Sequence, residues 1–244
     1  MIADRESNAS YWSRRLERHF SLRGTGHLSY SEGYNAWLYR AKRRALRPAL
    51  ARLRPGARAL DLGSGTGWVV AELLARGAAV EGCDIAPVAV ERLRRRFEGV
   101  DFFPLELGRQ PIPRPDASFD ALTAVDVLYH VTDDGAFEAA LAEAARVLVG
   151  GGVLVATDGL GDSDRLPAAH VRFRSRARWT DAARAAGLDL ATTWPLYRWL
   201  SRDRERGTMA HLPGRVRGPI EYGLDLVSRR PAHMRVAVLE KRAP

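Results

Sequence analysis

A glycine-rich turn between two apolar segments carries the residues with the clearest chemical meaning. Residues 58–68 read Arg-Ala-Leu-Asp-Leu-Gly-Ser-Gly-Thr-Gly-Trp, so a strand expected over 59–62 runs into the turn 63–67 and a helix is expected over 68–75. Glycine lets the backbone approach a ligand closely or adopt a positive φ, and the helix begins with free N–H groups over the turn. The pattern predicts a nucleotide-type site at the carboxyl end of a parallel sheet.

Two carboxylates flank this turn. Asp61 lies inside the first apolar segment, where it can face a cationic or hydrogen-bond-donating group of a ligand. Asp84 ends the next apolar run, 79–84, and an acid at that strand end is placed to bind both hydroxyls of a ribose. The dinucleotide fingerprint is not matched, because Gly67 comes one residue early and Trp68 stands where a small residue is required. The pattern therefore does not require a pyrophosphate.

Four blocks of sequence, in a fixed order, resemble one enzyme family. They are Leu60–Gly67, Cys83–Ile85, Ser118–Val125 and Ala145–Val155. They are similar to the class I S-adenosyl-methionine-dependent methyltransferases of the small-molecule type, and the last block resembles that family's RxLxPGG turn with Val149-Gly150 where proline is usual. The resemblance implies an α/β fold with a Rossmann-like, doubly wound, seven-stranded sheet, mostly parallel with an antiparallel last strand. It also implies S-adenosyl-L-methionine as the cofactor.

The predicted cofactor-binding residues combine the turn and its acids with positions that the resemblance adds. They are Asp61, Gly63, Ser64, Gly65, Gly67, Asp84, Ile85, Glu106, Leu107 and Val125. Glu106 follows the strand expected over 100–105, where the family usually has an aspartate that accepts a hydrogen bond from the adenine amino group. The alternative is that Glu106 is a surface side chain in a loop.

The resemblance places the acceptor substrate just beyond a strand expected over 119–127. His130 is therefore a candidate general base, since its pKa range suits proton transfer, although it can also simply shape the pocket. Asp126 is interpreted as a substrate-binding acid or as a partner for backbone N–H groups. Asp158, after a strand expected over 153–157, is the second candidate base or substrate anchor. No metal ligand set is expected.

The N-terminal region, 1–55, is expected to form a helical lid over the pocket. Apolar residues recur at helical spacing within 10–20, and a basic amphipathic helix is expected over 34–53. Tyr30 and Tyr34 are predicted to face the acceptor. The alternative is that the aromatic side chains of this region only pack the helices on the core.

The rest of the chain, 56–244, is expected to form the methyltransferase core. Helices are predicted over 87–97, 133–148 and 178–186, and strands over 188–193 and 234–240. The polar connection 159–178 is long for a structureless loop, which often indicates function, and its His170 is a candidate substrate contact. An insertion at about 196–231 is interpreted as a wall of the acceptor pocket or as a solvated flap.

Composition limits the classes of protein. The 244 residues are 46% hydrophobic with a net charge of +9, as expected of a globular chain. Only Lys42 and Lys241 are lysines, so the basic balance is interpreted as solvated arginines and nucleic acid is not expected as a partner. The single cysteine, Cys83, is expected in the core. Without a signal peptide or an apolar stretch that could span a bilayer, a cytoplasmic location and no membrane partner are expected.

The predicted function is transfer of a methyl group from S-adenosyl-L-methionine to a small-molecule acceptor, such as a hydroxyl of a secondary metabolite or sugar. Little electrostatic assistance is needed, because positive charge disperses in the transition state and alignment supplies most of the rate. Two alternatives stay open: an RNA or protein methyltransferase, and a non-catalytic protein that binds the cofactor for a partner. The acceptor atom, the use of a base and the oligomeric state, monomer or homodimer, also stay open.

Overall fold

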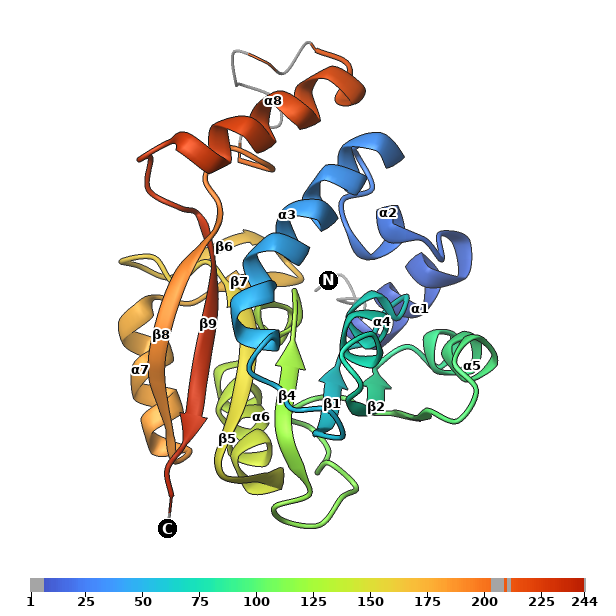
Figure 1. The fold of residues 1–244 in the computed structure, drawn as a ribbon, viewed down its shortest axis with the longest axis vertical. Coiled ribbons are helices and arrows are strands. Elements are labelled where there is room, and N and C mark those ends of the chain that lie inside the picture. Colours follow the sequence, from blue (N-terminus) through green and yellow to red (C-terminus); the bar gives the residue numbers. More distant parts are fainter. Residues whose placement is uncertain (1–6, 203–208, 210–211, 244) are drawn as a thin grey trace, which may run out of the picture.

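A seven-stranded sheet forms the centre of the computed structural model, which describes residues 7–202, 209 and 212–243 (Figure 1). The strand order is β3-β2-β1-β4-β5-β9-β8. The strands are β1 Arg58–Leu62, β2 Ala79–Asp84, β3 Asp101–Pro104, β4 Phe119–Ala124, β5 Leu148–Asp158, β8 Leu188–Tyr197 and β9 Met234–Lys241. Strands β1 to β5 pair in parallel, and β9 runs antiparallel to both β5 and β8. The predicted fold class is confirmed.

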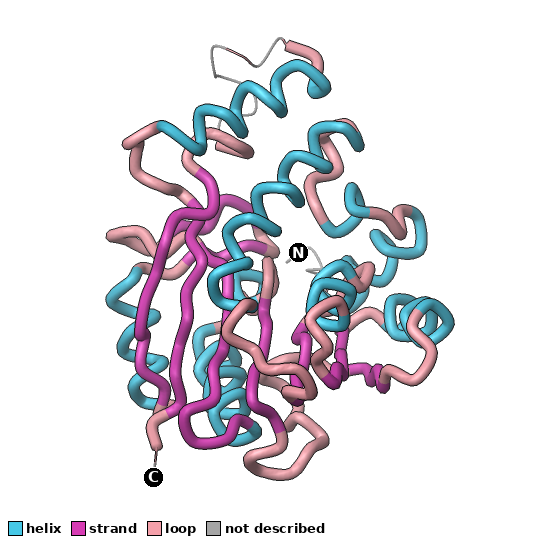
Figure 2. Tube along the Cα trace, viewed as in Figure 1, coloured by secondary structure: helices cyan, strands magenta, loops and turns pink. Residues whose placement is uncertain are grey.

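Helices cover both faces of the sheet (Figure 2). They are α1 Asn8–Arg18, α2 Leu22–Thr25, α3 Glu32–Leu50, α4 Trp68–Leu74, α5 Pro87–Arg96, α6 Asp134–Val147, α7 Arg176–Ala185 and α8 Gly214–Val227. One apolar cluster packs the sheet against α6 and α7, and a second packs it against α3, α4 and α5. Burial on both faces explains why β4 and β5 read as almost continuous apolar runs. None of the described helices has the length and apolar character needed to cross a bilayer.

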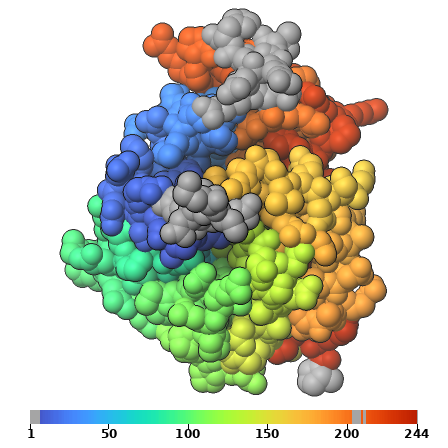
Figure 3. All heavy atoms as spheres, turned by 180° about the vertical axis from the view of Figure 1, so that it is seen from behind, coloured from blue at the N-terminus to red at the C-terminus, as the bar shows by residue number. Residues whose placement is uncertain are grey.

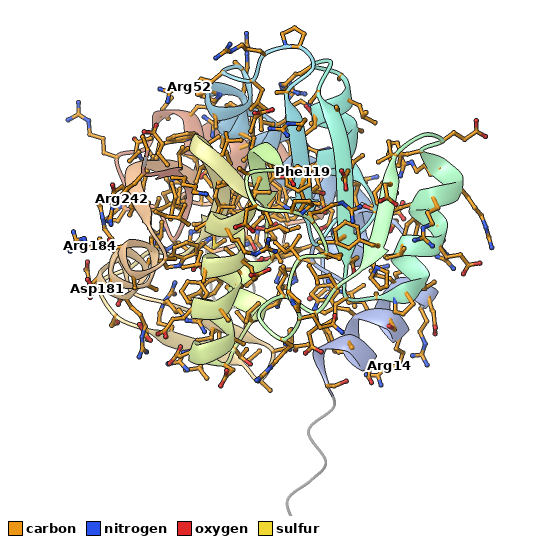
Figure 4. All side chains as sticks on the ribbon, turned by 90° about the horizontal axis from the view of Figure 1, so that it is seen from below. Arg14, Arg52, Phe119, Asp181, Arg184 and Arg242 are labelled. Carbon is orange, nitrogen blue, oxygen red and sulfur yellow. The ribbon has the colours of Figure 1, made fainter. Side chains whose placement is uncertain are left out.

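The arginines are mostly on the outside, as the composition suggests. Figure 4 shows Arg14, Arg184 and Arg242 extending away from the body of the protein, whereas Phe119 lies inside it. Arg146 is an exception, since it bridges Glu143 and Asp116 and donates to backbone carbonyls of the loop before β4.

Three expectations about local structure need correction. Strand β4 ends at Ala124, three residues before the predicted end, because the chain turns there through a positive φ of 61° at Asp126 into a short 3₁₀ helix, Leu128–His130. The connection 159–178 is not structureless: it contains a hairpin of β6 Arg165–Ala168 and β7 Val171–Phe173. Strand β8 is four residues longer than predicted.

The segments predicted as a lid and an insertion are only partly described. Residues 1–6 of the first, and 203–208, 210 and 211 of the second, lie outside the described residues. The described part of the insertion contains α8, which packs on α3 at one end of the long axis of the molecule (Figure 1). From behind, Figure 3 shows the blue N-terminal residues lying against the green residues of the sheet's first half.

Candidate functional site

A single cavity gathers the carboxyl ends of β1, β2 and β4 under the N-terminal helices. Its lining comes from three sources: the glycine turn, the segments that follow β2, β3 and β4, and α1 to α3. The lining includes Gly63, Ser64, Gly65, Thr66, Asp84, Ile85, Leu105, Glu106, Leu107, Arg109, Val125, Asp126 and His130 from the core, and Asn8, Trp12, Leu16, Thr25, Tyr39 and Lys42 from the N-terminal helices. The structure therefore brings together eight of the ten predicted cofactor residues.

The remaining two, Gly67 and Asp61, lie directly behind this lining. Gly67 caps α4 with a φ of 79°, which favours glycine. A Cβ atom at this position would lie 2.4 Å from the ring of Phe97 and 2.7 Å from Leu93, so the turn also packs closely on α5. Glycine at this position is thus required by conformation and by space.

Asp84 connects the turn to the end of β2. Its Oδ2 accepts a hydrogen bond from the Gly65 N–H at 2.7 Å, and its Oδ1 accepts one from the Ala86 N–H at 2.9 Å. Burial raises the pKa of the carboxyl group above its usual value, although these backbone N–H groups oppose the shift. Each oxygen of a carboxylate has a second lone pair, so the side chain can accept two further hydrogen bonds from the cavity.

Asp61 is fully buried beneath the turn. Its Oδ1 accepts a hydrogen bond of 2.6 Å from the Thr123 hydroxyl, while its Oδ2 has no hydrogen-bond partner among the described residues. Burial raises the pKa of Asp61 to about 7, against the effect of hydroxyl donors. A buried oxygen without a partner costs free energy, and a positive charge on a ligand above the turn would favour the ionised form of this carboxyl group.

A buried ion pair lies at the other end of the cavity. Lys42 Nζ is 2.5 Å from Asp126 Oδ2 and 3.9 Å from the centre of the Tyr39 ring. Burial by itself lowers the pKa of Lys42, but the negative charge of Asp126 outweighs that effect, so the net shift is upward. Burial likewise opposes ionisation of Asp126, yet Lys42 holds its pKa below the usual value. Both groups are therefore charged at neutral pH.

Asp126 is held in place by its backbone conformation and by Thr157. The Thr157 hydroxyl accepts a hydrogen bond from the Asp126 N–H and donates one to Asp126 Oδ1, both at 2.8 Å. A positive φ is uncommon for a residue other than glycine, and such residues concentrate at functional sites. The geometry fixes the carboxylate at the cavity wall before any ligand binds.

His130 lies half-buried beside the ion pair as a neutral imidazole. Its Nδ1 is 2.7 Å from the backbone carbonyl oxygen of His170, and because a carbonyl only accepts, Nδ1 carries the proton and Nε2 does not. Burial lowers the pKa of His130 to about 4. Helix α1 packs directly on this residue: the Trp12 ring meets it edge-on at 4.9 Å, and Asn8 Nδ2 donates to its carbonyl oxygen at 2.7 Å. A ring with this pKa is a weak base and a good hydrogen-bond acceptor.

The structure does not bring Asp158 into the cavity. Successive residues of a strand point to opposite faces of the sheet, so Thr157 faces Asp126 and Asp158 faces α7. There Asp158 is fully buried, and its carboxylate accepts hydrogen bonds from Trp179 Nε1 at 3.0 Å and from the Gly159 N–H at 2.5 Å. This position indicates a structural role for Asp158. It does not support the expectation that Asp158 acts as a base or substrate anchor.

The predicted substrate contacts other than Asp126 also lie outside the lining. Tyr34 is fully buried between α3 and α8, where its hydroxyl donates to Glu221 and accepts from the Ser201 N–H at 2.9 Å. Tyr30 packs on Tyr34 with ring centres 4.2 Å apart. His170 acts through its backbone carbonyl on His130 while its ring stacks on Tyr11 at 4.4 Å. These residues position the walls of the cavity and do not face it.

Most of the N-terminal contribution to this site was not predicted from the sequence. Lys42 is the most informative omission, because it is one of two lysines in a chain that otherwise uses arginine. The rarity of lysine could have marked Lys42 as a functional side chain. Composition alone, however, indicated only a general preference for arginine. Asn8, Trp12, Thr25 and Tyr39 follow helical spacing only in part, and nothing in their sequence context separates a cavity side chain from a packing one.

Comparisons with known proteins agree with this geometry. Residues 60–156 match the family model described as a methyltransferase domain. The chain is 39% identical over 100 residues to a demethylmenaquinone methyltransferase of Tropheryma whipplei, covering 41% of each chain. It is 36% identical over 95 residues to a ubiquinone biosynthesis O-methyltransferase of Hahella chejuensis, covering 38% of this chain and 40% of the relative. The matched region thus spans about two fifths of these relatives.

A solved structure extends the likeness to almost the whole chain. The 1,6-didemethyltoxoflavin-N1-methyltransferase of Burkholderia thailandensis, solved with its substrate and S-adenosylhomocysteine, aligns with a TM-score of 0.58 over 99% of this chain and 93% of that protein. At 18% identity this likeness shows a common fold.

Proposed function

We propose that this chain, whose residues 60–156 match a methyltransferase-domain model, is a class I S-adenosyl-methionine-dependent methyltransferase that transfers a methyl group to a small hydroxylated aromatic acceptor bound under the N-terminal helices. The observation that carries the proposal is one cavity with two unlike ends. Backbone and carboxylates of the glycine turn form the first end, and the ion pair of Lys42 and Asp126 with the neutral His130 forms the second.

The first end fits the cofactor. The spare lone pairs of Asp84 match two ribose hydroxyls, and the carboxyl group of Asp61, directly behind the lining, favours a positively charged ligand group above the turn. Leu105 and Leu107 provide an apolar surface for a purine ring, with the exposed Glu106 at its rim as an acceptor for the amino group. The bound cofactor supplies an electrophilic methyl group on a sulfonium.

The second end fits an acceptor with an acidic hydroxyl. Lys42 directs a fixed positive charge into the cavity and can donate to an acceptor oxygen, which lowers the free energy of its ionised form. The Asp126 carboxylate is ionised and can accept a hydrogen bond from the hydroxyl of the acceptor. The neutral His130 orients the acceptor without removing its proton. Trp12 and Tyr39 present aromatic surface against which a flat ring can stack.

The names of the two curated relatives support this class of acceptor, since one refers to demethylmenaquinone and the other to ubiquinone biosynthesis. A hydroxyl oxygen of such an acceptor, or the ring carbon next to it, would form the new bond to the methyl carbon while the donor's carbon–sulfur bond breaks to leave a neutral thioether, and the acceptor would release one proton to solvent. A sugar hydroxyl, which the sequence also suggests, fits less well. Its pKa is too high for a base as weak as His130, and the aromatic side chains at this end suit a flat ring better.

The test measures binding and turnover separately. Calorimetry should show that S-adenosyl-methionine and S-adenosylhomocysteine bind, whereas NAD and ATP do not. With a labelled methyl donor, a panel of hydroquinones, phenols, sugars, mixed RNA and a peptide library should give methylated product with hydroquinones or phenols only. Methylated RNA or peptide would replace the small-molecule acceptor, and cofactor binding without any product across the panel would favour a non-catalytic cofactor-binding protein.

A further inference from the structure

Helix α8 is amphipathic, but its charged side faces the protein and its apolar side faces solvent. A surface helix normally turns its apolar side chains to the core and its charges to solvent. In α8 the charged side chains Arg217, Glu221 and Asp225 are buried, whereas four of its apolar side chains are exposed. Those exposed side chains are Val216 (42%), Ile220 (43%), Leu226 (52%) and Val227 (79%).

The buried charges of α8 are accounted for by specific partners. Arg217 Nε donates to Glu221 at 2.6 Å, and the Tyr34 hydroxyl donates to the same carboxylate. Asp225 Oδ1 accepts from the backbone N–H groups of Arg198 and Trp199 at 2.8 and 2.6 Å. These bonds determine which face of α8 is turned inward, so the outward apolar face is a consequence of defined packing.

Three of these exposed side chains lie in a stripe along one side of α8, with the partly exposed Gly223 between Ile220 and Val227. Val216, Ile220, Gly223 and Val227 follow at intervals of four, three and four residues, which places them on one side of a helix. Leu226 lies at the margin of this stripe. Figure 1 shows α8 as the outermost helix at its end of the molecule, beyond α3. An exposed apolar stripe on an outermost element indicates a surface that binds an apolar partner.

The charges around the stripe identify the kind of partner. Arg215 and Arg229, at the two ends of α8, are exposed, and the exposed Arg40 of α3 lies over the Tyr222 ring of α8 at 5.6 Å. Both acids of α8 are on its inward face. Apolar side chains flanked by guanidinium groups complement a lipid surface with anionic headgroups, where the side chains enter the acyl boundary and the arginines contact phosphate.

We propose that α8 docks this protein on the surface of membranes that contain anionic lipid, with the stripe of Val216, Ile220, Gly223 and Val227 inserted and Arg215 and Arg229 at the headgroups. The inference concerns a surface away from the cavity and does not rest on the proposed methyl transfer. It departs from the expectation, drawn from the sequence, that no membrane partner exists.

Sedimentation of the full chain with lipid vesicles tests the proposal. The chain should sediment with vesicles of phosphatidylcholine and phosphatidylglycerol and remain in solution with phosphatidylcholine alone. Replacing Ile220 and Val227 together by glutamine removes apolar contact without adding charge and should weaken binding to the mixed vesicles at least about tenfold. Arg215→Gln should weaken it about fivefold. The matched control is Leu166→Gln, an equally drastic change at a residue 65% exposed on the β6–β7 hairpin, which should keep full binding.

Three results would overturn the proposal. The first is wild-type protein that binds neither kind of vesicle. The second is a double variant that binds like the wild type while thermal unfolding shows that both are folded. The third is concentration-dependent self-association in analytical ultracentrifugation that the Ile220→Gln, Val227→Gln variant abolishes, because the stripe would then be an interface between two copies of the chain.

Discussion

The cavity wall built from strand ends and the wall built from the N-terminal helices differ in what fixes their shape. On the strand side, the Gly65 N–H of the turn donates to Asp84, and the turn conformation follows from glycines close in sequence. On the helix side, single side chains reach across the fold: Lys42 pairs with Asp126, and Asn8 bonds the carbonyl of His130. The first wall is defined locally and the second by tertiary contacts.

This difference suggests a division of labour that substitutions can test. The strand side is expected to control the affinity for the cofactor, because its groups match the methyl donor, which is the same whichever acceptor is methylated. The helix side is expected to control turnover and the choice of acceptor, because its side chains surround the space left beyond the turn. Each substitution below should therefore change one of the two quantities much more than the other.

Asp84→Ala is expected to have the largest effect on the strand side. It removes two charge-assisted hydrogen bonds to the cofactor, each worth about 1.5–3 kcal/mol, so the affinity for S-adenosyl-methionine in calorimetry should fall by more than about 100-fold. Glu106→Ala is the matched control, since this carboxylate is exposed at the rim and its loss should cost less than about fivefold. Wild-type affinity in Asp84→Ala would show that the ribose is bound elsewhere.

Lys42→Met is expected to have the largest effect on the helix side. Turnover should fall about 100-fold while cofactor affinity stays within about threefold, because the acceptor loses the charge that stabilises its ionised form. The substitution also leaves Asp126 buried without its partner, which should cost about 3 kcal/mol of unfolding free energy in urea denaturation.

The double variant Lys42→Met, Asp126→Asn separates these two losses. Asparagine tolerates the positive φ at position 126 and removes the uncompensated charge, so much of the stability should return while turnover stays low. Recovery of both quantities together would mean that the ion pair serves stability alone, and the acceptor end would need another anchor.

The same division explains what the sequence could predict. The strand order, the turn and Asp84 were predictable because periodicity, glycine spacing and strand ends are local signals. The early end of β4 was not, since it depends on the left-handed conformation of Asp126, which the hydroxyl of Thr157 stabilises from a neighbouring strand. Helix α8 was not predicted although Val216, Ile220 and Val227 follow helical spacing, because the segment between them also contains two glycines and Pro219, which disfavour a helix interior.

The helix side was the less predictable wall for a related reason. Tyr30 and Tyr34 were sensible candidates as aromatic residues of a lid, yet they face α8, and the charged partner Glu221 that draws Tyr34 there is far away in sequence. Lys42 lies on the same helix as Tyr34, and only the assembled fold shows that it reaches Asp126. Pairings between distant side chains have no local signature.

His130→Gln sharpens the comparison with a smaller effect. Glutamine keeps hydrogen-bonding capacity but not ring shape, so turnover should fall about tenfold with cofactor affinity within about twofold. Because burial lowers the pKa of His130 to about 4, the imidazole is already neutral at pH 6, and the wild-type pH–rate profile should show no histidine step between about pH 5 and 8. A step near pH 6.5 that disappears in the variant would restore His130 as general base.

Asp158→Asn should have the smallest effect on turnover, within about twofold, because this carboxylate faces α7 and not the cavity. The substitution should instead change the free energy of unfolding. Burial raises the pKa of Asp158 to about 7, so between the unfolded value near 3.9 and 7 the folded state holds a proton that the unfolded state has lost. Stability must therefore fall as pH rises through that window, by at most about 1.4 kcal/mol per pH unit, and level off above it.

Urea denaturation from pH 5 to pH 8 checks this expectation. The wild type should lose stability over the range, and Asp158→Asn should lose less, with a remaining slope from Asp61, whose pKa burial also raises to about 7. A variant that keeps its fold and its pH slope but loses turnover about 100-fold would contradict the structural role. In that case the carboxylate would have to reach the acceptor through a rearrangement of β5. The residues that control turnover would then include a strand residue as well as the N-terminal helices.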